Sequence, residues 1–282
     1  LVFCPGDRVA GITSGASFPT PLLFPDKIRI YFSSRGENNQ SSIFYVDVDR
    51  NDPSKVIHAS NEPLLSPGKL GTFDDCGAQP MHALRHDGKV YLYYLGWNPG
   101  VTVLARNNTG LAISHDDGTT FERAFEGPIM DRTKDEPYFA YTPEILIEDG
   151  VWRMWYGSGT GWQLIDGKAE GLFEIKYAYS HDGIDWVRPN ITCIPPVHPL
   201  EVNCRPAIAK KDGRYHMWYS LRTVEDFRGG KNSYRIGYAH STDGDIWTRD
   251  DSNAGIEVSA AGWDSEMICF CSVIETDGKL LM

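Results

Sequence analysis

The chain has 282 residues, 41% of them hydrophobic and 23% charged, and a formal net charge of −11. This acidic balance argues against a sequence-independent binder of nucleic acid or of an anionic membrane surface, because such a protein needs a basic face. No apolar run approaches the roughly 18 residues that a membrane span requires. No signal peptide is visible at the start of the sequence, so we expect a cytoplasmic protein.

The cysteine and histidine pattern predicts no metal site. The six cysteines include no C-x-x-C pair, and their spacing matches no zinc template. A protein of this length does not need disulfides, so we expect reduced and mostly buried thiols. No cluster of His, Asp and Glu has metal-ligand spacing, and we therefore expect neither a metal nor a cofactor.

A phrase of two strands around a tight turn recurs along the chain. It consists of an apolar strand, an Asp-Gly turn and an aromatic-rich strand, and Asp-Gly between alternating runs is a strong hairpin signal. Full copies cover residues 82–97, 144–159 and 207–222. A looser copy covers 21–35, and a shortened one covers 271–282. We predict a β-hairpin in each copy.

A second repeated phrase occupies residues 111–123, 177–188 and 238–249. Each copy is an alternating strand, then Ser-x-Asp-Gly or a close variant, then an aromatic residue and Arg. The Gly supplies the positive φ of a tight turn, and the Asp carboxylate bonds the turn backbone. These turns resemble the Asp-boxes of sialidases, which implies a structural role.

The residues that open the hairpin phrases are regularly spaced. They are Pro19 or Pro21, Pro80, Pro143, Pro206 and, in the last copy, Cys271, at steps of about 60 to 65 residues. No segment shows sustained helical periodicity. Antiparallel modules of this size predict an all-β fold, a five-bladed β-propeller that forms a single domain over residues 1–282. The blades are expected at 12–65, 66–131, 132–195, 196–258, and 259–282 with 1–5, the fifth being truncated at the C-terminus.

Acidic residues precede most of the expected opening strands. In a propeller, the residues just ahead of each blade's first strand gather at one mouth of the central channel. The candidates are Asp75 beside Asp74, Tyr138 flanked by Asp135 and Glu136, Glu201 before Arg205, and Glu266 near Asp264, whereas blade one has Ser14 and no acid. Two carboxylates that face one pocket are the minimum for glycoside cleavage, one as general acid and one as nucleophile or base.

Several stretches resemble a known group of proteins. They are GTFDDCGAQP (71–80), YLYYLGWNPGVTV (91–103), WRMWYGSGTGW (152–162), YRIGYAHSTDG (234–244) and GWDSEMI (262–268). They are similar to bacterial glycosidase-like proteins found with surface-polysaccharide genes, in the five-bladed arabinanase, levansucrase and invertase superfamily. The resemblance covers essentially the whole chain, and it implies the propeller fold more strongly than any one activity.

The resemblance also implies where catalytic residues lie. Glycoside hydrolase families 32, 43 and 68 take an Asp from blade one, an Asp from blade two and a Glu from blade three. Here Asp75 matches the second position, and the third falls to Glu136 or Glu144. Blade one offers SGASFPTP (14–21) without an acid, and Glu266 in blade five is an additional candidate. The related mannoside phosphorylases of family 130 use an Asp with basic residues for phosphate.

The sequence therefore predicts a glycoside hydrolase that acts on a poly- or oligosaccharide. The candidate catalytic residues are Asp75, Glu266 and Glu201. The candidate substrate-binding residues are Asp74, Arg205, Arg35, Arg222, Tyr138, Trp162 and Trp263. A phosphorylase or transferase on the same scaffold and a non-catalytic glycan-binding propeller are the alternatives. The expected partner is a carbohydrate, not a nucleic acid or a membrane, and the oligomeric state stays open.

Overall fold

The computed structural model describes residues 3, 15–36, 38–228 and 232–282. Contacts divide the molecule into two compact units, residues 1–99 with 105–131 and residues 100–104 with 132–282. Almost all regular structure is β, with a short 3₁₀ turn at Asp251–Asn253. Within the described residues, no helix is long and apolar enough to cross a membrane.

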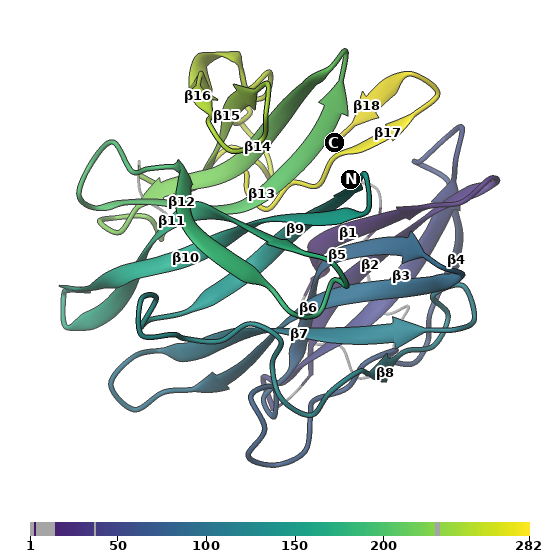
Figure 1. The fold of residues 1–282 in the computed structure, drawn as a ribbon, viewed down its shortest axis with the longest axis horizontal. Coiled ribbons are helices and arrows are strands. Elements are labelled where there is room, and N and C mark those ends of the chain that lie inside the picture. The colour runs from purple at the N-terminus through teal and green to yellow at the C-terminus, as the bar shows by residue number, and fades with distance from the viewer. Residues whose placement is uncertain (1–2, 4–14, 37, 229–231) are drawn as a thin grey trace. The chain divides into compact units, whose positions relative to one another are not determined.

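Antiparallel four-stranded sheets make up both units. The first unit has β1–β4 (Ser17–Leu23, Lys27–Arg35, Ser41–Asp49, Val56–Ala59) and β5–β8 (Ala78–His86, Lys89–Pro99, Ala105–Ser114, Glu122–Arg123). The second unit has β9–β12 (Ala140–Glu148, Val151–Ile165, Lys168–Ser180, Val187–Ile194) and β13–β16 (Glu201–Lys211, Arg214–Thr223, Arg235–Ser241, Thr248–Arg249). In each sheet, strands that follow one another in sequence are hydrogen-bonded neighbours (Figure 1). This meander is the blade of a β-propeller.

The blade count differs from the prediction. The described residues form four four-stranded blades, not five, and the last repeat forms only the two-stranded sheet β17–β18 (Ile274–Thr276, Lys279–Leu281). Residues 259–273 take no strand conformation, so Cys271 lies outside any strand, whereas Pro80 lies within β5 and Pro206 within β13. The outer strand expected from residues 1–5 lies, apart from Phe3, outside the described residues.

Asp-Gly turns connect the predicted hairpins. Asp87-Gly88 joins β5 to β6, Asp149-Gly150 joins β9 to β10, and Asp212-Gly213 joins β13 to β14. Both residues of each turn have positive φ, between 48° and 76°. This is the type I′ geometry that matches the right-handed twist of paired strands. The hairpins predicted at 82–97, 144–159 and 207–222 are therefore confirmed.

Each unit buries its own aromatic core. In the first unit, Tyr31 and Tyr94 are fully buried among aliphatic residues of β2, β5 and β6. In the second, Trp155, Tyr215 and Tyr219 lie in one cluster with residues of β10, β11 and β14. Stacking large aromatic residues between neighbouring sheets removes much apolar area from water, which is the main stabilising contribution in an all-β fold.

Of the described thiols, Cys193 and Cys204 are buried as predicted, whereas Cys76, Cys269 and Cys271 are partly exposed. Cys76, Cys193, Cys204, Cys269 and Cys271 are free, and Cys4 lies outside the described residues. Burial raises the pKa of the Cys204 thiol to about 12, so this thiol is protonated and unreactive at neutral pH.

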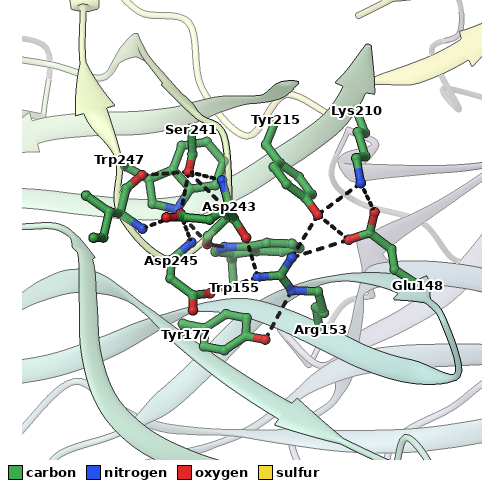
Figure 2. Close-up of polar contacts among 12 residues, drawn as sticks. Glu148, Arg153, Trp155, Tyr177, Lys210, Tyr215, Ser241, Asp243, Asp245 and Trp247 are labelled. Carbon is green, nitrogen blue, oxygen red and sulfur yellow. Dashed lines mark hydrogen bonds and ion pairs between the residues drawn. The ribbon is translucent and has the colours of Figure 1, made fainter. Parts of the chain in front are cut away.

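Two of the three Ser-x-Asp turns dock onto a neighbouring blade of the same unit. In the first unit, the Tyr31 hydroxyl donates to the Gly118 carbonyl at 3.0 Å. In the second, the Trp155 indole donates to the Gly244 carbonyl at 2.7 Å, and Arg153 reaches Asp245 at 2.8 Å (Figure 2). These contacts join adjacent blades through buried polar groups, which agrees with the structural role implied by the sequence.

Replacing Gly118 by alanine should destabilise the protein by about 1–3 kcal/mol. Gly118 has φ 77°, and an added Cβ would overlap the Tyr31 hydroxyl that anchors the turn. Urea unfolding measures the effect. The matched control is Gly127→Ala in the same unit, where an added Cβ meets nothing within 4 Å. Equal unfolding midpoints for the two variants would contradict the docking role.

The same turns should give the protein an acid-sensitive component of stability. Burial alone would raise the pKa of Asp116, but hydrogen bonds from Thr119, Thr120 and Ser114 outweigh it and lower the pKa to about 2. A depressed folded-state pKa contributes stability that is present above the unfolded value near 3.8 and is lost as the pH falls towards 2. We expect Asp116→Asn to flatten the fall of the urea midpoint between pH 4 and 2, as measured against the unsubstituted protein. Superimposable pH profiles would exclude this contribution.

Candidate functional site

Three opening strands carry a strained residue. Phe18, Thr142 and Arg205 have φ between 51° and 57°, each directly before a proline of the repeated phrase. The pairing register of β1, β9 and β13 shifts at the same points. Large or branched side chains rarely adopt positive φ, and such strain collects at functional sites. The starts of these strands are therefore where functional side chains are expected.

Asp74 lies in a buried ion pair within the first unit. Its side chain is 1% exposed. Oδ2 accepts hydrogen bonds from the Tyr94 hydroxyl at 3.0 Å and from Arg123 Nε at 2.8 Å, and Oδ1 accepts one from Thr72 at 2.9 Å. All of these partners belong to the same blade, so the structure directs this predicted substrate-binding carboxylate towards its own sheet.

We call a buried acid ahead of a blade, together with the tyrosine and the arginine of that blade that bond to it or to its neighbouring acid, a clasp. Each blade of the second unit also has a clasp. In the blade of β9–β12, Glu136 accepts from the Tyr156 hydroxyl at 2.7 Å and from Arg188 at 2.8 Å. In the blade of β13–β16, Arg249 donates to both Glu201 and Asp251 at 2.6 Å, and the Tyr219 hydroxyl donates to Asp251 at 2.6 Å.

The predicted catalytic residue Glu201 is thus held by a clasp. Its side chain is buried, Oε1 accepts from Arg249, and Oε2 accepts from the Val197 amide at 3.3 Å. Sequence reasoning missed the clasps, although their members recur with the blade period as Asp74, Glu136, Glu201, then Tyr94, Tyr156, Tyr219, then Arg123, Arg188, Arg249.

Asp75 differs from its neighbour Asp74. It is half-buried, Oδ2 accepts the Gly71 amide at 3.0 Å, and the buried Oδ1 has no hydrogen-bond partner among the described residues. No cation of the described part of the sequence forms an ion pair with it. Burial, followed by the Asp75 charge, raises the pKa of the adjacent Cys76 thiol. A carboxylate in this setting is available to another hydrogen-bond donor.

The turn that carries Asp75 is held against Trp97 and β3. The Cys76 amide donates to the Trp97 carbonyl at 3.2 Å, and the Ser41 amide donates to the Cys76 carbonyl at 3.1 Å. The Trp97 indole donates to Ser41 Oγ at 2.8 Å, and the Arg35 guanidinium lies 5.0 Å from the Trp97 ring centre. Contacts among the turn, β2, β3 and β6 of the first unit thus link segments that carry a carboxylate, an indole and a guanidinium, three residue types found in sugar sites.

Glu266 and Trp263 lie on the surface of the second unit. Trp263 is 80% exposed. Glu266 is exposed too, its backbone carbonyl accepts from Arg235 at 2.9 Å, and its carboxylate has no partner among the described residues. Both residues belong to the second unit, whereas Asp75 belongs to the first.

Arg205 is a buried cation of the second unit. Its side chain is 1% exposed, and its guanidinium donates to Ser272 at 3.1 Å. Complete burial lowers the pKa of Arg205, and Glu144 opposes this as the largest favourable charge. Buried charges are kept in pairs because an isolated one is very costly. Arg205 and Glu144 lie in neighbouring blades, on β13 and β9, and interact electrostatically, a pairing that sequence reasoning did not predict.

The remaining predicted binding residues, which lie in the second unit, have different environments. Trp162 packs edge-on against Phe139 with ring centres 5.5 Å apart, whereas Tyr138 is 41% exposed. Arg222 is buried and stacks on Phe227. Across the described ranges, no group of three or more His, Cys, Asp and Glu side chains could hold a metal ion.

No family model matches this sequence, but a comparison with individual proteins finds relatives. Two uncharacterised proteins, from Mycobacterium tuberculosis strains CDC 1551 / Oshkosh and ATCC 25618 / H37Rv, are each 36% identical over 283 residues, which is 100% of this chain and 91% of theirs. The protein belongs to the same family as these mycobacterial proteins.

Solved structures show the scaffold of this family. A glycoside hydrolase matches with a TM-score of 0.75 and 17% identity, over 99% of this chain and 84% of its own. The RGII complex of BT0996 matches with a TM-score of 0.73 and 17% identity over the same shares. A thermostable family-43 glycoside hydrolase matches with a TM-score of 0.62 and 20% identity, over 88% of this chain and 75% of its own. The protein therefore shares a β-propeller fold with solved glycoside hydrolases.

Proposed function

We propose that the protein is a glycoside hydrolase that cleaves a poly- or oligosaccharide by carboxylate acid–base chemistry. The glycosidase-like scaffold supports a carbohydrate substrate. Membership of the arabinanase, levansucrase and invertase superfamily is part of the same proposal. Fold alone does not assign an activity, so the proposal depends on the site residues.

The observation that carries the proposal is the contrast between Asp74 and Asp75. These adjacent carboxylates have opposite environments, since Asp74 is fixed by Arg123 and Tyr94, whereas Asp75 has no cation and one oxygen without a hydrogen bond among the described residues. A general acid or nucleophile needs such freedom to bond the substrate, and a neighbouring rigid support positions it. We assign Asp75 the catalytic role in the first unit, with Trp97 and Arg35 as sugar contacts.

Glu266 is the candidate catalytic carboxylate within the second unit. It combines an exposed carboxylate without a partner among the described residues with a nearby exposed indole, Trp263, and an indole face suits the apolar face of a sugar ring. Glu201 is less suited than the sequence predicts, because Arg249 occupies its Oε1. In the proposal, Glu201 therefore supports the blade and Glu266 replaces it in the chemistry.

The second candidate function is a non-catalytic glycan-binding propeller. The clasps favour it, because they engage Asp74, Glu136 and Glu201 in ion pairs and so remove three carboxylates from acid–base work. The absence of an acid from the stretch 14–21 favours it as well.

A panel of plant and bacterial poly- and oligosaccharides separates these functions. The purified protein is incubated with each glycan, with and without inorganic phosphate, and new reducing ends and sugar phosphates are quantified. Hydrolysis independent of phosphate is the expected result. Sugar phosphate formed only with phosphate present would replace hydrolysis by phosphorolysis, and binding by calorimetry without turnover would establish the binding module.

A further inference from the structure

Arg222 is a buried cation that forms no ion pair with any acid of the described residues. It lies near the end of β14, and its side chain is 6% exposed. Its Nη1 donates to the Thr223 carbonyl at 3.0 Å, and its buried Nε has no acceptor among the described residues. The nearest acids that follow it in sequence, Glu225 and Asp226, are exposed.

Aromatic rings surround this guanidinium. It lies 3.7 Å from the ring centre of Phe227 and 5.2 Å from that of Tyr234. Tyr141 of the adjacent blade is in electrostatic contact with it, is partly exposed, and has no hydrogen bond to its hydroxyl from the described residues. Phe227, Tyr234 and Tyr141 therefore line the Arg222 site with ring faces and one available phenol.

Two other arginines of this unit have carboxylate partners, which Arg222 lacks among the described residues. Arg249 of the same blade binds two carboxylates, and Arg188 binds Glu136. Burying a charge without a counter-charge costs free energy, and cation–π contacts offset only part of that cost. A bidentate oxyanion grips arginine through Nε together with one Nη nitrogen, and Nε is the atom left without an acceptor among the described residues.

We propose that the Arg222 site binds the oxyanion of an acidic sugar, a uronate carboxylate or a sugar phosphate, in the substrate of the proposed hydrolase. The inference rests on the proposed function and adds a substrate class to it. Arg222 supplies the counter-charge, Tyr141 a hydrogen bond, and Phe227 and Tyr234 apolar faces for the sugar ring. A free inorganic anion would use the cation alone, whereas an acidic sugar uses both the cation and the rings.

Binding measured by calorimetry tests the site without requiring turnover. The probes are D-glucuronate, D-glucose 6-phosphate, D-glucose and inorganic phosphate, with the full chain at low ionic strength. We expect one or both acidic sugars to bind at least about tenfold more tightly than glucose and than phosphate. Which of the two binds identifies the source of the oxyanion. Equal affinity for glucose, or equal affinity for inorganic phosphate, would overturn the inference.

Three variants assign the effect to this site. Arg222→Met should weaken acidic-sugar binding by about tenfold or more, and Arg222→Lys, which keeps the charge without the fork and preserves the fold, should weaken it by a smaller factor. Arg214→Met, at an exposed arginine on the same strand, is the matched control and should bind like the unsubstituted protein. Unchanged affinity in Arg222→Lys and Arg222→Met would overturn the inference.

The outcome is separable from that of the proposed function. Acidic-sugar binding that depends on Arg222, with no glycan hydrolysed, would support the Arg222 site and contradict the proposed hydrolase. Glycan hydrolysis, together with acidic-sugar affinity that Arg222→Met leaves unaltered, would support the hydrolase and contradict the Arg222 site.

Discussion

Replacing Asp75 by asparagine should lower the rate of glycan hydrolysis by about 10²- to 10⁴-fold without unfolding the protein. The amide is isosteric but neither donates a catalytic proton nor acts as a nucleophile or base. Asp75 accepts a hydrogen bond from the Gly71 amide, and an amide oxygen can accept that bond too. The loss should appear in kcat, with a small change in KM, because the carboxylate acts on the transition state.

Steady-state kinetics on the best glycan of the panel measures this effect. The matched control is Asp87→Asn in the same blade, because Asp87 opens a type I′ turn in which Asn-Gly is equally favoured. This control should retain full activity and stability. Glu266→Gln should also lower kcat. Full activity in both Asp75→Asn and Glu266→Gln would remove the assigned roles and leave the glycan-binding propeller.

Replacing Arg249 by methionine should destabilise the protein by about 3–5 kcal/mol. Arg249 is the shared cation of Glu201 and Asp251, and Glu201 is buried. Its removal leaves two carboxylates close together without a counter-charge, one of them out of water. Methionine keeps most of the packing volume, so the loss reports charge rather than a cavity.

Urea or thermal unfolding measures this loss. Arg214→Met, at an exposed position of the same blade, should change stability by no more than about 0.5 kcal/mol. The double variant Arg249→Met with Glu201→Gln should recover part of the loss, because it removes one of the buried charges. A destabilisation of Arg249→Met as small as that of the control would show that the clasp is a weak surface ion pair.

The local structure was predictable because its causes are local. The Asp-Gly dipeptides impose positive φ at two successive residues, which is the conformation of a hairpin turn. The serine and aspartate of each Ser-x-Asp turn bond the backbone within four residues of themselves, as Ser114 and Asp116 do. Such contacts need no knowledge of the rest of the fold, and the hairpins and turns agree with the structure.

The blade count was harder to predict, because a repeated turn motif does not ensure that the residues around it pair into a four-stranded sheet. The last copy has the Asp277-Gly278 turn and forms its hairpin, but the residues ahead of it do not pair. A blade needs hydrogen-bond partners on successive strands, and a count of turn motifs does not report those partners.

The environment of each carboxylate was decided by tertiary structure alone. Asp74, Glu136 and Glu201 meet arginines that are 49, 52 and 48 residues away in sequence. Sequence by itself determined the strands, the turns and the acids that precede the blades. Only folding decided that Asp74 forms an ion pair with Arg123 and that Asp75 forms none, because such a pair depends on where the fourth strand of a blade lies relative to the segment ahead of its first strand.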